Sequence, residues 1–369
     1  MPKDNYKHIQ VGGKITVRPW NLTEKPKFYA THITLVVGPT GAGKSSFIEA
    51  LSGDKSLRIS KNQLDGYTQS VTPYEVVNAR YTYKSICLLD CPGFSDTNIS
   101  EMEIMDMIKK WLKTHGIDSV QSILYFCPVT DMRLPGSKLR TIEMLKALVT
   151  GSGSKNSSGE KSNEGGVTIV TTMWDTVWNL RMKERAEANF IQLRDSVWKV
   201  CACITRFLNT QDSALVILDD CRAHWGSAFG DAYRVVDEKG PLGDTYYGRL
   251  LYQDLLGRIE SARTQKRALE SELTQEEVRN NPALHSIIKT GLRTTDRILK
   301  KFEKQLDLFT DITAESEEQV HEPRQTTDLS VSDTRGMNHE GERTRTWMKS
   351  TLVRVQKISK NLNAFRSKK

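Results

Sequence analysis

Short apolar runs alternate with longer segments of helical spacing between residues 31 and 222. The runs are typical of buried strands, and they lie at Ile33–Val37, Ser85–Leu89, Ser122–Cys127, Val167–Thr171 and Ala214–Leu218. Between them, Met102–Lys113 and Leu139–Val149 carry apolar side chains at the three- and four-residue intervals of amphipathic helices. This alternation predicts an α/β domain with a mainly parallel, six-stranded sheet flanked by helices.

The chain before this domain, and one stretch inside it, have a different pattern. Residues 1–30 are polar and contain three prolines, so we predict a flexible arm with at most a short edge strand at Lys14–Val17. Residues 151–166 are rich in glycine and serine and show no periodicity. We therefore predict a mobile insertion there.

Two series of apolar residues at helical spacing follow the last predicted strand. They begin at Tyr252 and Leu284, and Pro282 separates them. Residues 245–313 are therefore predicted to form an antiparallel helical pair. Packing of this pair on the α/β domain is favoured over an independent coiled coil, because so few heptads are only marginally stable alone.

The last 56 residues of the sequence consist of an acidic segment followed by a basic one. Residues 314–342 hold eight acidic and two basic side chains and little to bury, which predicts a disordered linker. Residues 343–369 hold nine basic and no acidic side chains, so subtracting nine from the net charge of +8 leaves −1 elsewhere. A near-neutral body gives no reason to expect a specific nucleic-acid partner.

The basic segment 343–369 also has apolar residues at helical spacing, from Trp347 to Phe365. We predict a basic amphipathic helix, with three alternatives for what it contacts. It docks on the helical pair, lies on an anionic membrane, or binds a groove or surface of another macromolecule.

The location of the protein is predicted from segments that it lacks. No apolar run approaches the ~18 residues that cross a bilayer, and the first ten residues contain no apolar signal core. Most of the six cysteines lie in apolar runs, as reduced thiols of cytosolic proteins do, and Cys201 and Cys203 have no second pair at zinc-ligand spacing. We expect a cytoplasmic protein, with peripheral membrane attachment through the basic helix as the alternative.

The first motif with a chemical meaning is G-x-x-x-x-G-K-S between a predicted strand and a predicted helix. Its glycines allow backbone N–H groups to converge on phosphates, Lys44 adds a positive charge, and the Ser45 hydroxyl is a ligand for Mg²⁺. The predicted phosphate-binding residues are Gly38, Pro39, Thr40, Gly41, Ala42, Gly43, Lys44, Ser45 and Ser46.

The second motif is D-x-x-G at the end of the apolar run 86–89. Asp90 can hold a water on Mg²⁺, and the Gly93 backbone N–H can bind the γ-phosphate. The motif is weak alone, but it follows Lys44 by 46 residues and comes at the next predicted core strand. We therefore include Asp90 as a metal ligand and Gly93 as a catalytic residue.

Thr172 and Asp175, after the run 167–171, are predicted to recognise the base. A carboxylate there can accept hydrogen bonds from the N1–H and the exocyclic amine of guanine, whereas adenine has the wrong donor pattern. Met173 stands where many GTPases have lysine, and its aliphatic chain can lie along the base. The alternative is that Asp175 caps the following helix.

A threonine between the first two motifs is expected to reach Mg²⁺ and the γ-phosphate. In the segment Leu57–Val77 we choose Thr72 over Thr68, as both a catalytic and a metal-binding residue. The alternative is a surface hydroxyl without such a role.

The four motifs together, GPTGAGKSS, SVT, LLDCPGFSDT and IVTTMWD, resemble the septin-like GTPases of the immunity-associated (GIMAP) and chloroplast-translocon (Toc) group. The most similar are the fungal P-loop "G domain-containing" proteins. The resemblance covers about residues 30–220. It implies a Ras-like G domain of the P-loop NTPase class and GTP/GDP with Mg²⁺ as cofactors. It also implies a nucleotide-dependent homodimer through the G-domain face, and a fifth nucleotide-contacting loop at Phe207–Ala214.

The residue after Gly93 is Phe94, where a Ras-like enzyme has a water-orienting glutamine. We therefore expect a slow GTPase that acts as an assembly switch. The missing catalytic group would be supplied in trans, and Arg133 is a candidate for a catalytic arginine. One rival is a GTP-dependent scaffold with negligible turnover. Another is an ATP-using P-loop enzyme such as a kinase, which the T-x-x-D motif and the lack of an Arg-rich lid disfavour.

Overall fold

The computed structural model describes residues 6–20, 31–53, 70–94, 96, 98–117, 119–130, 140–145, 167–197, 203–223, 233–234 and 246–318. Residues Met1–Thr313 form one compact unit and Ala314–Lys369 a second. The predicted insertion at 151–166, the basic helix at 343–369, Thr68 and Arg133 lie outside the described residues. The elements below belong to the first unit, apart from the end of the last helix.

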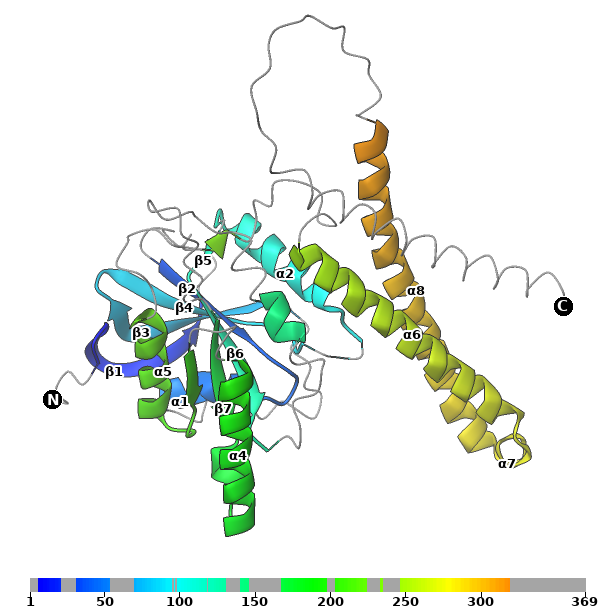
Figure 1. Ribbon diagram of the computed structural model, residues 1–369, viewed down its shortest axis with the longest axis horizontal. Coiled ribbons are helices and arrows are strands. Elements are labelled where there is room, and N and C mark those ends of the chain that lie inside the picture. Colours follow the sequence, from blue (N-terminus) through cyan, green and yellow to red (C-terminus); the bar gives the residue numbers. More distant parts are fainter. Residues whose placement is uncertain are drawn as a thin grey trace, which may run out of the picture. The chain divides into compact units, whose positions relative to one another are not determined.

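A seven-stranded sheet in the order β1-β3-β4-β2-β6-β7-β8 lies at the centre of the first unit (Figure 1). Strands β4, β2, β6, β7 and β8 run parallel, and β1 and β3 add an antiparallel edge. The mainly parallel α/β fold predicted from the sequence is thus confirmed. The strands are β1 (Ile9–Pro19), β2 (Thr31–Val37), β3 (Thr72–Tyr81), β4 (Lys84–Asp90), β6 (Ser122–Pro128), β7 (Val167–Thr172) and β8 (Cys203–Arg206), while β5 (Ser119–Val120) and β9 (Tyr233–Arg234) form a separate pair.

The sheet has seven strands rather than six, because β1, β3 and β8 add to the four strands whose positions were predicted. The predicted edge strand at Lys14–Val17 is part of β1, but β1 is longer, and the flexible arm predicted over residues 1–30 is wrong for the rest of Ile9–Pro19. Ile15 and Val17 are buried, and the Asp219 carboxylate accepts the backbone N–H groups of residues 7, 8 and 9 at 2.7, 2.7 and 2.8 Å. Asp219 lies more than 200 positions away in the chain. A local polar pattern cannot reveal such an anchor.

The apolar run Ala214–Leu218 is part of a helix, α5 (Gln211–Ala223), and its prediction as a strand is wrong. Ala214, Leu215, Ile217 and Leu218 are buried while Val216 is 38% exposed, which is helical and not strand periodicity. Strand β8 takes the place at the sheet edge instead. A five-residue apolar run does not by itself distinguish a strand from a buried helix segment.

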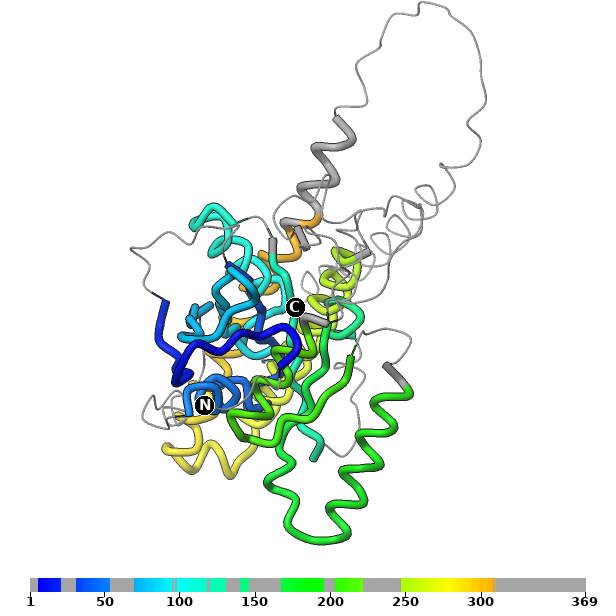
Figure 2. Tube along the Cα trace, turned by 90° about the vertical axis from the view of Figure 1, so that its left-hand side faces the viewer, coloured from blue at the N-terminus to red at the C-terminus, as the bar shows by residue number. Residues whose placement is uncertain are grey.

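Helices cover both faces of the sheet. Helices α1 (Lys44–Ser52) and α5 pack on one face, where β1 also passes α1 (Figure 2). Helix α2 (Glu101–Thr114) packs on the other, close to the predicted Met102–Lys113. A short helical segment is described at residues 140–145, within the predicted helix Leu139–Val149. Helix α4 (Leu180–Val197) follows a turn of 3-10 helix, η4 (Trp174–Thr176).

The C-terminal region forms the predicted antiparallel helices: α6 (Tyr246–Thr274), the short α7 (Glu276–Arg279) and α8 (Pro282–Glu318). Ion pairs join Arg263 to Glu303 at 2.7 Å and Lys266 to Asp296 at 2.5 Å across the pair. Helix α8 continues into the predicted disordered linker as far as Glu318, and alanine and glutamate in that stretch favour helix. None of the described helices is long and apolar enough to cross a bilayer.

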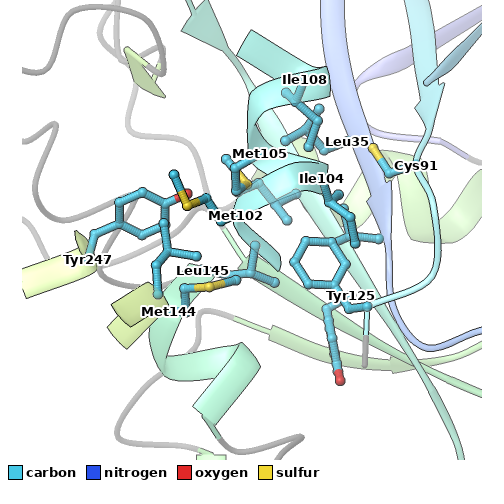
Figure 3. Packing of buried hydrophobic residues seen from close by; sticks show 14 of the residues in the cluster. Leu35, Cys91, Met102, Ile104, Met105, Ile108, Tyr125, Met144, Leu145 and Tyr247 are labelled. Atoms are coloured by element: carbon cyan, nitrogen blue, oxygen red, sulfur yellow. The ribbon is translucent and has the colours of Figure 1, made fainter. Parts of the chain in front are cut away.

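The helical pair packs on the α/β domain, as predicted, and is not an independent coiled coil. Tyr247 of α6 lies beside Met102 of α2, with Met144 and Leu145 near both (Figure 3). These side chains belong to one buried cluster that also holds Phe302 of α8. The helices therefore share the core of the domain.

Candidate functional site

The phosphate-loop motif joins the end of β2 to the start of α1. Gly38, Gly41 and Gly43 have φ values of 144°, 76° and 89°, a region that favours glycine. A Cβ atom on Gly38 would lie 2.5 Å from the carbonyl oxygen of Phe126. Gly43 caps α1 without a side-chain acceptor, so the first N–H groups of the helix are free of a side-chain cap. This is the arrangement in which a loop and a helix N-terminus bind an anion.

Lys44 lies within the loop rather than in solvent. Its Nζ donates to the carbonyl oxygens of Gly38 at 2.9 Å and Pro39 at 3.0 Å, and the residue is 7% exposed. Burial lowers the pKa of Lys44, and the nearby Asp90 carboxylate opposes that shift. A phosphate group would give this ammonium a charged partner where it now has carbonyl dipoles.

Asp90 ends β4 and is 2% exposed. Its Oδ1 atom is buried without a hydrogen-bond partner. Burial raises the pKa of Asp90 to about 6, and Lys44 opposes the rise. A buried carboxylate oxygen without a donor fits a cation or a water molecule bound to one.

The sheet brings Thr72 to the same place. Thr72 begins β3, and its Cα is paired with that of Asp90 in the antiparallel register of β3 and β4. Ser45 follows Lys44 in the first turn of α1, and both hydroxyl residues are half-buried. One carboxylate and two hydroxyls are oxygen donors suited to Mg²⁺, so these residues fit the predicted ion.

The segment after Asp90 lies against the phosphate loop. The Phe94 backbone N–H donates to the Gly38 carbonyl at 3.0 Å. A Cβ atom on Gly93 would lie 2.0 Å from Thr40 Oγ1, so only glycine fits there. The Phe94 side chain is fully buried in the core and cannot contact a water molecule at the site.

The base-recognition residues lie at the end of β7. Thr172 Oγ1 donates to the Ala42 carbonyl at 2.9 Å, which ties this strand to the phosphate loop. Asp175 is exposed in η4 and accepts a hydrogen bond from Asn209 Nδ2 at 2.9 Å. Asp175 does not cap α4, because the Asn179 side chain accepts the Met182 N–H at 2.8 Å in that role. The capping alternative is therefore wrong.

Asn209 is a site residue that was not predicted from the sequence. It lies within the predicted fifth loop, Phe207–Ala214, and has a φ of 57°. Ser213 braces the loop by accepting the N–H groups of Leu208 and Thr210 at 3.2 and 3.3 Å. Asparagine tolerates the left-handed conformation better than most residues, which is a weak signal for a turn but not for this contact.

Arg206 also supports this end of the site. Its guanidinium lies 4.4 Å from the centroid of the Trp174 ring, and it makes two hydrogen bonds of 2.8 Å with Glu187. Trp174 precedes Asp175, and its Nε1 donates to Thr171 Oγ1 at 3.1 Å. These contacts fix the backbone that presents the Asp175 carboxylate.

The structure thus gathers most of the predicted site residues at one edge of the sheet. The loop residues Pro39, Thr40, Gly41 and Ala42 precede α1, and Ser46 follows Ser45 in its first turn. Strands β2, β4 and β7 run parallel and end beside this loop. In parallel α/β sheets, ligands bind at such carboxyl ends of strands.

Comparison with protein-family models agrees with this geometry. Residues 33–149 match the model described as "50S ribosome-binding GTPase". This part of the chain is a P-loop GTPase domain. The match to the GTPase domain includes the phosphate loop and the Asp90 segment, and it ends before Thr172 and Asp175.

Solved structures with similarity to the chain include a bacterial selenocysteine-specific elongation factor, EF-Sec (14% identity, 52% of this chain and 28% of that one, TM-score 0.34). A dimerization-deficient mutant of Toc33 from Arabidopsis thaliana has 16% identity over 60% of this chain and 82% of its own, with a TM-score of 0.32. The cytosolic domain of FeoB from L. pneumophila has 13% identity over 77% and 97%, with a TM-score of 0.31. The chain thus spans little more than a quarter of the elongation factor. A search of curated proteins found no match.

Proposed function

We propose that the protein binds GTP and GDP with Mg²⁺ and hydrolyses GTP slowly, so that the bound nucleotide controls its assembly. The observation that carries this proposal is the convergence of Lys44, the unpartnered Asp90 oxygen and the exposed Asp175 carboxylate at the ends of three strands. Lys44 supplies a positive charge for the phosphates, Asp90 an oxygen for the magnesium ion, and Asp175 a hydrogen-bond acceptor for guanine.

The phosphates would lie at the N-terminus of α1. Lys44 would exchange its two carbonyl partners for phosphate oxygens, and Ser45, Thr72 and Asp90 would hold the ion. When bound, Mg²⁺ neutralises negative charge on the phosphates. The Gly93 N–H would face the third phosphate, after the segment moves from its contact with Thr40.

Guanine would lie beside Asp175. Its carboxylate offers two acceptor oxygens to the N1–H and the exocyclic amine, and Asn209 holds one of those oxygens in place from the side. Adenine would leave this carboxylate facing an acceptor nitrogen, which costs a hydrogen bond and adds repulsion. This favours the GTPase over an ATP-using P-loop enzyme.

Slow hydrolysis follows from the burial of Phe94. A fully buried phenyl ring cannot align the attacking water, and its backbone N–H is engaged by Gly38. We propose that the missing group comes from a second copy of the chain, docked through the G-domain face. The scaffold with negligible turnover remains the rival. The cytoplasmic location stays a prediction. So do the three alternatives for what residues 343–369 contact.

We expect phosphate release to be slow, and the specific activity to rise with protein concentration because only the homodimer is competent. Turnover by a single copy should lie far below that of assisted GTPases, which gain ~10⁵-fold from a supplied arginine and an oriented water. Single-turnover phosphate release over two decades of protein concentration measures both properties.

The possible results separate the candidates. Fast hydrolysis that is independent of concentration would contradict the slow switch and the trans-acting group together. Slow hydrolysis that is independent of concentration would leave the switch without trans activation. No measurable release at any concentration would favour the scaffold.

A further inference from the structure

The helical pair contacts the segment after Gly93, here the described residues 94, 96 and 98–100, which precede α2. This segment belongs to the candidate site, because it continues from the D-x-x-G motif that ends at Gly93. Three polar side chains of α6 and α8 contact it. Arg258 donates to the carbonyl of Asp96, Lys301 donates to the carbonyl of Asn98 at 2.7 Å, and Gln305 Oε1 accepts the Ser100 hydroxyl at 2.7 Å.

Asp96 connects these contacts to the phosphate loop. It is 6% exposed, and its Oδ2 atom lies 3.5 Å from Thr40 Oγ1. A chain of direct contacts therefore runs from Arg258 through Asp96 to Thr40. Coupling between a site and a distant element requires such a physical connection.

Arg258 is itself held firmly. Its Nε donates to Asp254 Oδ2 at 2.7 Å and Glu101 Oε2 at 2.9 Å, and the Glu101 side chain is 3% exposed. Burial disfavours the charge of Arg258, but the carboxylates of Glu101 and Asp254 more than offset this and raise its pKa. The guanidinium is thus a charged and fixed contact for the Asp96 carbonyl.

The arrangement that Arg258 holds is unfavourable for a third phosphate. A Cβ atom on Gly93 would lie 2.0 Å from Thr40 Oγ1, so Gly93 packs directly against Thr40 and no phosphate group fits between the two residues in this arrangement. The Phe94 N–H is also engaged by Gly38 at 3.0 Å. If the Gly93 N–H binds the third phosphate, as proposed above, a triphosphate requires this segment to move off the loop, whereas a diphosphate lacks the phosphate that would displace it.

We propose that Arg258 is a positioning residue of the nucleotide site, through which the helical pair holds the segment after Gly93 on the phosphate loop and favours GDP over GTP. The inference rests on the proposed function, since it concerns the choice between two guanine nucleotides. A ligand that needs the segment to move must also weaken its contact with Arg258, because coupling is reciprocal.

The test compares affinities for GDP and a non-hydrolysable GTP analogue in the full chain. In the double variant Arg258→Met with Glu101→Gln, both charges of the buried pair are removed, and the other partner of Arg258, the Asp254 carboxylate, is 32% exposed and can be hydrated. Lys301→Met removes the contact with Asn98 from a side chain that is 37% exposed. The control, Arg263→Met, breaks an ion pair with Glu303 between the same helices without a contact to the segment.

We expect the preference for GDP over the analogue to fall about tenfold in the Arg258 variant, a typical coupling between two sites. It should fall by less in Lys301→Met and stay unchanged in Arg263→Met. An unchanged preference in the folded Arg258 variant would overturn the inference while leaving the proposed function intact. If that variant does not fold, an unchanged preference in Lys301→Met overturns it. A wild-type chain that binds neither guanine nucleotide would overturn both.

Discussion

Replacing Lys44 with alanine is expected to lower the affinity for GTP by about 100-fold, the loss that follows when charged hydrogen bonds to phosphate disappear. In the structure the Lys44 ammonium is bound to two loop carbonyls and lies near the buried Asp90. Bound phosphate oxygens would give it charged hydrogen-bond acceptors in place of the two carbonyls. Calorimetric titration of the variant with GTP and Mg²⁺ measures the change.

The control for this experiment is Lys183→Ala, which removes an exposed lysine from α4. Circular dichroism and the melting temperature should show that both variants are folded. A folded Lys44→Ala protein with wild-type affinity for GTP would mean that the loop does not bind the phosphates.

The substitution Asp175→Asn is expected to shift the preference from GTP toward xanthosine triphosphate by about 100-fold, because hydrogen bonds are exchanged between the two bases. Xanthine has a carbonyl where guanine has its exocyclic amine, so it needs a donor opposite. An asparagine amide supplies that donor. Competition of each nucleotide against a fluorescent GTP analogue gives the ratio.

The matched control is Asp195→Asn on α4, where the carboxylate is 63% exposed and pairs with its neighbour Arg194. It should leave the nucleotide preference unchanged. If Asp175→Asn retains the guanine selectivity of the wild type, Asp175 does not contact the base. Asn209 would then serve only to brace the turn at the end of β7.

The fold was predictable where a buried strand carries its own signal. Runs such as Ile33–Val37 are apolar throughout because both faces of a parallel strand are covered, and they appear as strands in the structure. Strand β1 was predicted only at Lys14–Val17, strands β3 and β8 were not predicted, and helix α5 was predicted as a strand. The polar edge strand depends on Asp219, and the run Ala214–Leu218 satisfies both a strand and a helix pattern.

The site was predictable where a motif fixes several residues at once. The spacing in the phosphate loop requires glycines and a lysine together, so Lys44 could be assigned from the sequence alone. Asn209 and Arg258 could not, because each matters only through a residue distant in the chain, Asp175 and Asp96 respectively. Such contacts follow from tertiary packing and leave no local pattern.

The central claim is that this site binds guanine nucleotides with magnesium. Calorimetric titration of the wild-type chain with GTP, GDP and ATP, each with and without Mg²⁺, tests it most directly. We expect saturable one-to-one binding of both guanine nucleotides, tighter GTP binding with Mg²⁺, and at least about 100-fold weaker binding of ATP, as expected when a carboxylate faces the wrong base edge. Equal or tighter binding of ATP, or no binding of either guanine nucleotide, would contradict the assignment.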